Sequence, residues 1–99
     1  MNINDFRDTL STDAPPDELS HALRALWYDA SGDWDAAHGE AQEQDDRAGA
    51  WVHAYLHRKE GDLANAGYWY RRAGQPVAHG ALEDEWAAIA ETLLAEERS

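Results

Sequence analysis

Cysteine is absent from this chain of 99 residues, and only three of its residues are proline. The lack of cysteine excludes disulfides, thiolate metal sites and cysteine nucleophiles. Basic residues are also few: 8 lysines and arginines stand against 20 acidic residues, and the net charge of −12 repels nucleic acid and anionic membranes. No apolar stretch approaches the roughly 20 residues that cross a bilayer, and the first residues do not resemble a signal peptide. We therefore expect one acidic cytoplasmic domain that binds neither nucleic acid nor a membrane.

Valine and isoleucine are scarce, and no segment alternates between apolar and polar residues, which argues against strands. Alanine, leucine, glutamate and arginine dominate, and all four favour helices. The sequence therefore predicts an all-α fold. The expected helices span residues 3–10, 17–31, 34–45, 47–60, 63–73 and 81–97. Asn4 is the predicted N-cap of the first helix. The last helix has the clearest amphipathic pattern, and its apolar side carries Leu82, Trp86, Ile89 and Leu93.

A short repeat joins two pairs of these helices. The segment GDWDAA, which starts at Gly32, recurs 29 residues later as GDLANA, which starts at Gly61. Glycine adopts the left-handed conformation that ends a helix, and the aspartate that follows can cap the next helix. We therefore expect a positive φ at Gly61, an N-cap at Asp62, and two stacked helical hairpins.

The spacing around these joints resembles the tetratricopeptide repeat, in which one helix carries W-x₂-L-G-x₂-Y and its partner carries A-x₃-F. The second copy matches as A-x₂-H-A-x₂-H from Ala50 to His57, and then as Ala66-x₃-Tyr70. The first copy matches as H-x₂-R-A-x₂-Y from His21 to Tyr28, and then as Ala37-x₃-Ala41. Both copies lack the Trp and Leu of the first motif. The resemblance covers roughly residues 18–76 and implies two hairpins (17–45 and 47–74). Together with the chain length, it predicts a single domain over residues 1–99, in which an N-terminal arm (1–16) precedes the hairpins and a capping helix (81–97) follows them.

The stretch from Trp51 to Gly74, WVHAYLHRKEGD followed by YWYRRAG, is also similar to that of a group of short bacterial proteins with no assigned activity. This similarity implies a bacterial cytosolic origin.

The same stretch holds most of the candidate binding residues. On the helix 47–60, Trp51, Tyr55, Arg58 and Lys59 share one side. The tetratricopeptide resemblance turns that side toward an inner, concave surface, where family members bind peptides, and adds Leu26 and Asp29 from the preceding hairpin. Aromatic and cationic side chains together are typical of a surface that binds an acidic or C-terminal carboxylate peptide. We therefore expect the Trp51 and Tyr55 rings to keep a solvent-facing side. The alternative is that both rings fill the core, which we expect for Trp27, Trp34, Trp69 and Trp86.

A metal site is the competing chemical interpretation. His53, His57 and Glu60 fall on one side of the same helix, and a metal could use all three. Two histidines and one glutamate at helical spacing are a pattern of low information, however, and the repeat alignment places both histidines at packing positions. The sequence therefore favours a packing role, with no metal or cofactor.

No catalytic motif is evident, since no serine lies in a nucleophile elbow and no glycine-rich loop follows a strand. We expect a non-catalytic module that binds a protein or peptide. One alternative is an acidic inhibitor or nucleic-acid mimic whose acidic N-terminal half binds a basic partner. The other is a small metal-dependent enzyme built on His53, His57 and Glu60.

Overall fold

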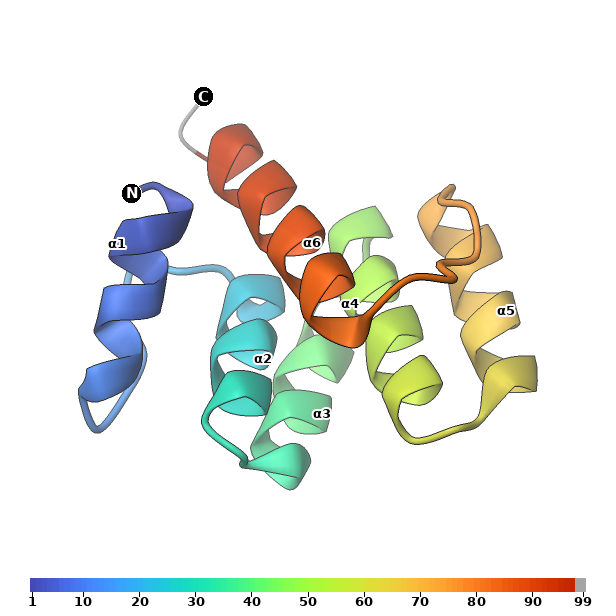
Figure 1. Cartoon of the computed structure of the whole chain (residues 1–99), viewed down its shortest axis with the longest axis horizontal. Helices are drawn as coiled ribbons and strands as arrows, with labels where there is room; N and C mark the ends of the chain where they lie inside the picture. The colour runs from blue at the N-terminus through green and yellow to red at the C-terminus, as the bar shows by residue number, and fades with distance from the viewer. Residues whose placement is uncertain (98–99) are drawn as a thin grey trace.

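A computed structural model describes residues 1–97 of the chain (Figure 1). In that range the chain forms α-helices and one short 3₁₀ helix, and no strand, so the prediction of an all-α fold is confirmed. The elements are α1 (Ile3–Asp8), η1 (Thr9–Ser11), α2 (His21–Ala30), α3 (Trp34–Glu43), α4 (Arg47–Lys59), α5 (Leu63–Ala73) and α6 (Leu82–Glu97). Within residues 1–97, none of these helices has the length and apolar character needed to cross a membrane.

The two glycine–aspartate joints have the predicted geometry. Gly32 and Gly61 have φ angles of 86° and 89°. The Asp33 side chain accepts a hydrogen bond from the backbone N–H of Ala36 at 3.1 Å, and Asp62 accepts one from Asn65 at 3.3 Å. Each glycine takes the left-handed turn without a steric penalty, and each aspartate binds a backbone N–H that the first turn of a helix leaves free. These local rules explain why α3 and α5 begin where the sequence predicts.

The N-terminal boundaries differ from the predictions. Asn2, not Asn4, caps α1, and it forms a reciprocal capping box with Asp5. The next helix, α2, begins at His21 rather than at residue 17, because the Ser20 side chain accepts a hydrogen bond from the backbone N–H of Leu23. In both cases a polar side chain two or three residues from the predicted boundary accepts the hydrogen bond from a free N–H group of the first turn.

Replacing Asp33 by alanine is expected to lower the free energy of unfolding by about 1 kcal/mol, because the first turn of α3 loses its side-chain acceptor. Chemical denaturation followed by circular dichroism measures the change. Asp13→Ala is the matched control, since Asp13 is an exposed loop aspartate outside every helix. Equal losses in the two variants would show that the joint adds no stability.

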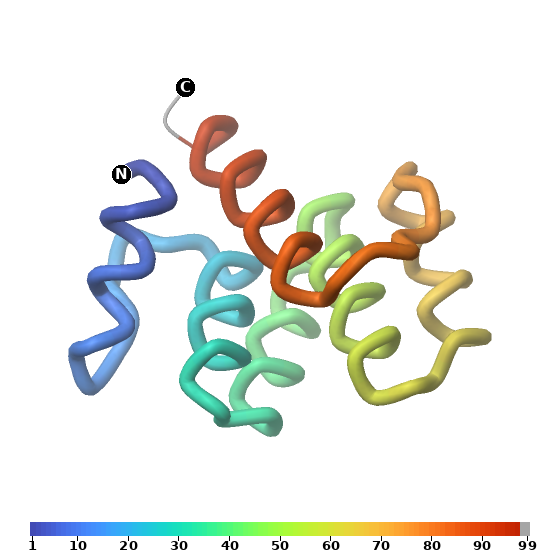
Figure 2. Tube along the Cα trace, viewed as in Figure 1, coloured from blue at the N-terminus to red at the C-terminus, as the bar shows by residue number. Residues whose placement is uncertain are grey.

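The helices are arranged as two adjacent pairs that a single helix crosses. The pairs are α2 with α3 and α4 with α5, and α3 also contacts α4. The C-terminal helix α6 runs obliquely over α2 and α4, and α1 lies beside it (Figures 1 and 2). We call the side of α2 and α4 that α6 crosses the inner face. The predicted capping helix thus has its main contacts with the inner face and with α1, rather than with α5 at the end of the row.

The main core lies between the inner face, α1 and α6. Phe6 of α1 is fully buried and stacks on Trp86 of α6 with ring centroids 5.6 Å apart, so the expected N-terminal arm is part of the core. Trp27 and Trp86 are buried, as expected. Trp34 and Trp69, which we also expected in the core, are only half-buried; Trp34 packs against His38 and Trp69 against His53.

Candidate functional site

Helix α6 covers most of the surface that the sequence assigned to a partner. Leu26 is fully buried, and Tyr55 is only 3% exposed. The Trp86 indole N–H of α6 donates to the Leu26 carbonyl at 3.0 Å, so α6 covers the inner face at Leu26. The expectation of a solvent-facing Tyr55 ring is therefore wrong. The physical reason is that the chain's own amphipathic helix buries its apolar side on the inner face.

Two buried carboxylates anchor the polar groups of the inner face. Asp29 accepts hydrogen bonds from the Tyr55 hydroxyl at 2.8 Å and from the Lys59 ammonium at 2.7 Å. Glu85 of α6 likewise accepts from Arg58, at 2.9 Å, and from the Tyr70 hydroxyl. Burial, together with the neighbouring carboxylate, raises the pKa of Tyr55 and that of Tyr70 well above the usual value for tyrosine. The predicted cations Arg58 and Lys59 thus each form an ion pair with a buried carboxylate of another helix, and Lys59 itself stays exposed.

The six predicted partner-binding residues do not form one surface. Asp29, Tyr55 and Lys59 lie together, whereas Arg58 is held by Glu85. Trp51 is half-buried and stands apart from them. It lines cavities bounded by α6 and by the connection from α5 to α6, residues 74–81.

One part of the inner face remains open. A cavity of about 420 Å³ lies where α1, α2, α4 and α6 meet, and three of the predicted residues line it, namely Asp29, Tyr55 and Lys59. The remaining lining residues are Arg7, Ala30, Leu82, Glu83 and Trp86. The sequence did not indicate Arg7 and Trp86 as lining residues, because they lie on α1 and α6, outside the two repeat copies. The only sequence signal for Arg7 was its position directly after the apolar Phe6.

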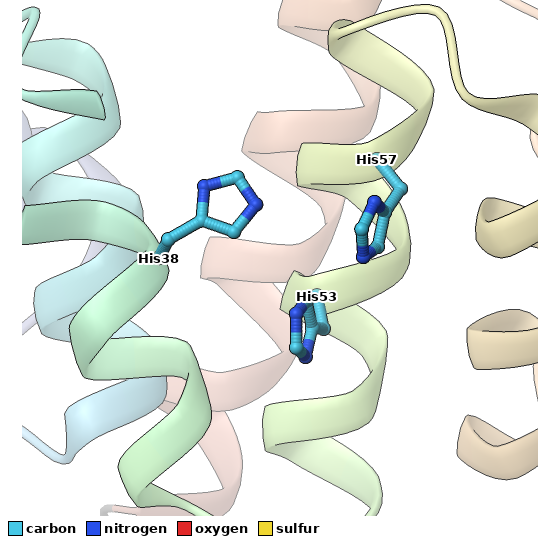
Figure 3. A group of neighbouring side chains, drawn as sticks. All are labelled: His38, His53 and His57. Atoms are coloured by element: carbon cyan, nitrogen blue, oxygen red, sulfur yellow. The ribbon is translucent and has the colours of Figure 1, made fainter. Parts of the chain in front are cut away.

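A cluster of three histidines lies on the opposite side of α4, toward α3 (Figure 3). His38 projects from α3 toward His53 and His57, which lie one turn apart on α4. One ring nitrogen from each of the three residues lies within 4.8 Å of the other two. The His53 and His57 rings stack with centroids 4.9 Å apart, and the His38 ring meets them edge-on at 5.8 and 5.7 Å. The cluster thus draws its nitrogens from two different helical pairs.

The surroundings keep His53 neutral. His53 is 7% exposed and stacks on Trp69 at 4.1 Å. Burial, and then the nearby His57 and His38, lower the pKa of His53 to about 4, against the opposing effect of Glu60. Glu60 itself lies 2.7 Å from Nδ1 of His57. At neutral pH, His53 therefore offers an uncharged imidazole, the form that binds metal ions.

The predicted trio of His53, His57 and Glu60 is only partly brought together. Glu60 contacts Nδ1 of His57 and belongs to a second, more exposed group with His57 and Asp62. His38 takes the third place beside the two predicted histidines. The signal for His38 in the sequence was its helical spacing: it lies four residues after Trp34 and three before the buried Ala41, so it faces inward.

No protein-family model, no curated protein and no solved structure matches this chain.

Proposed function

We propose that this chain is a non-catalytic interaction module of tetratricopeptide-like architecture, and that it binds a carboxylate of a partner peptide at the open cavity of its inner face. Two helical pairs with glycine–aspartate joints support the architecture. A concave pocket with a few convergent polar groups on mostly apolar walls is the usual form of a ligand site in proteins.

The state of Arg7 is the observation that carries this proposal. Arg7 lines the cavity, is exposed, and lies over the Trp86 ring at 5.8 Å. Its backbone carbonyl accepts a hydrogen bond from the cap of α1, but within residues 1–97 its guanidinium forms no hydrogen bond or ion pair. Its guanidinium is therefore available to a carboxylate, which it can bind through two parallel hydrogen bonds.

The other walls of the cavity suit a peptide end. Lys59 also lines the cavity, but Asp29 balances its charge through their 2.7 Å contact, so Arg7 is the cation of the lining that has no acidic partner. Leu82 and the ring of Trp86 supply apolar surface for an adjacent side chain. Because the protein carries a net charge of −12 and Glu83 also lines the cavity, a carboxylate is attracted only by a cation without an acidic partner, which here is Arg7.

Peptide binding tests the proposal. In a library of peptides with a free C-terminal carboxylate, the peptides that bind are expected to lose affinity at least about 10-fold, or 1.4 kcal/mol, when their carboxylate is amidated. The Arg7→Ala variant is expected to lose a similar amount, because it removes the unpaired guanidinium. Fluorescence anisotropy measures both changes.

Arg71→Ala is the matched control, since Arg71 is an exposed arginine on α5 that lines neither this cavity nor the inner face. The Arg71→Ala variant should bind the same peptides with the affinity of the unmodified chain. Amidated peptides that bind as well as free acids, or an equal loss in the Arg7 and Arg71 variants, would refute a carboxylate site at this cavity.

A further inference from the structure

We propose that His38, His53 and His57 bind one divalent transition-metal ion, with Zn²⁺ the best fit, and that Glu60 is a positioning residue for His57. This goes beyond the peptide site and is independent of it, because the two sites use opposite sides of α4. On the sequence alone the histidines of α4 were expected to have a packing role. The third imidazole, which comes from another helical pair, is the observation that changes this expectation.

The distances within the cluster suit a single ion. Zn²⁺ binds imidazole nitrogen at about 2.0–2.1 Å, so two nitrogens on a tetrahedral ion lie roughly 3.4 Å apart. The three nitrogens here lie within 4.8 Å of one another without an ion. Rotation of the rings about their side-chain bonds closes the remaining distance. His53 and His57 are already on the same side of α4, and His38 faces them from α3 (Figure 3).

Glu60 supports the ligand role of His57. Its carboxylate lies 2.7 Å from Nδ1 of His57, so Nδ1 carries the proton and donates it to Glu60. The lone pair that remains for a metal is then on Nε2. Metal-binding histidines usually donate their second ring N–H to a carboxylate or a carbonyl in this way.

The donor set indicates the kind of metal. Three imidazole nitrogens suit Zn²⁺, Co²⁺, Ni²⁺ and Cu²⁺, whereas Mg²⁺ and Ca²⁺ prefer oxygen ligands. Cysteine is absent, so no thiolate competes for the ion. Three nitrogen ligands leave one tetrahedral position for water or for a small ligand.

An ion can reach the cluster from the surface. His53 lines a cavity of about 400 Å³ between the α3–α4 connection and α5. The wall of this cavity also carries Gln42, Asp45, Asp46 and Trp69. The two exposed aspartates and the overall negative charge raise the local concentration of cations.

Titration with the metal alone tests the site. The full chain is stripped with a chelator and titrated with Zn²⁺ by calorimetry, and with Co²⁺ by visible absorption, which distinguishes tetrahedral from octahedral coordination. The expected result is one equivalent of tightly bound metal, with a tetrahedral Co²⁺ spectrum. His38→Ala is expected to weaken binding at least about 100-fold, and Glu60→Gln about 10-fold or more, because the glutamine no longer orients the ring of His57 as an anion does.

His79→Ala is the control for a surface histidine, since His79 is exposed and lies in the connection between α5 and α6. Circular dichroism without metal confirms that each variant is folded. A second experiment uses the unmodified chain, so its result does not depend on whether a variant folds. In proton NMR spectra, Co²⁺ should shift the ring signals of His38, His53 and His57 before those of His21 and His79.

Absence of binding at one equivalent overturns the proposal. So does a loss of affinity in His79→Ala that matches the loss in His38→Ala, or a first shift at His21 or His79. Each of these outcomes leaves the peptide site untouched, because Arg7 and its cavity share no residue with the histidine cluster.

Discussion

Replacing Trp86 by alanine is expected to lower the free energy of unfolding by about 3–5 kcal/mol. Trp86 is 7% exposed and joins three helices: it stacks on Phe6 of α1, and its indole N–H donates to the Leu26 carbonyl of α2. Removal of the ring opens a cavity between these helices that the short α1 cannot fill. Chemical denaturation followed by circular dichroism measures the loss.

Two further variants define the cause of the effect. Trp86→Phe keeps an aromatic ring against Phe6 but removes the indole donor, so it should lose less than the alanine variant. Leu63→Ala removes a large apolar side chain that is 68% exposed, and it should change the stability by no more than about 0.5 kcal/mol. If Trp86→Ala behaves like Leu63→Ala, then α6 does not hold the inner face closed in solution.

Alkaline pH is expected to destabilise the protein steeply. The pKa of Tyr55 and that of Tyr70 are raised by burial and by their hydrogen bonds to Asp29 and Glu85. Above pH about 10, these tyrosines ionise in the unfolded chain but keep their protons in the folded one. The folded state then binds more protons, so the free energy of unfolding falls as the pH rises, by up to about 1.4 kcal/mol per pH unit for each tyrosine. Below that pH the contribution is fully present.

Denaturation curves across the alkaline range measure this slope, and tyrosinate absorbance reports the ionisation itself. Tyr55→Phe is expected to remove about half of the slope, and its fold should persist because Asp29 keeps its ion pair with Lys59. Tyr68→Phe is the control, since Tyr68 is 41% exposed and bonded to neither buried carboxylate. A slope that survives in a chain with both Tyr55 and Tyr70 replaced by phenylalanine would contradict the assignment.

Ion pairs with buried carboxylates explain why Arg58 and Lys59 of α4 do not mark a binding surface. Arg58 and Lys59 follow the aromatic residues of α4, and this sequence pattern predicted a basic, partner-binding surface. In the structure each neutralises a carboxylate that α2 or α6 brings to the same interior. Because a buried carboxylate without a partner costs several kcal/mol, these cations are held in place by the fold.

The local features of this protein were determined by its sequence alone. Helical composition, the spacing of apolar residues in residues 81–97, and the glycine–aspartate joints at Gly32 and Gly61 predicted the all-α fold, and α3, α4, α5 and α6 begin within one residue of their expected positions. Such features depend on contacts between residues three or four positions apart, and the identities of those residues are visible in the sequence.

Only the tertiary structure decided which faces meet. Leu26, Asp29 and Tyr55, which we expected on a partner-binding surface, are buried where α6 crosses α2 and α4. The same arrangement leaves Arg7 beside an open cavity. The packing of α3 against α4 brought His38 to the two histidines that the sequence had placed together. These contacts join residues on different helices, and they depend on how apolar faces of similar composition pack. Which faces pack together depends on the apolar surface that the whole chain buries and on how closely its side chains pack. A local pattern in the sequence does not contain this information.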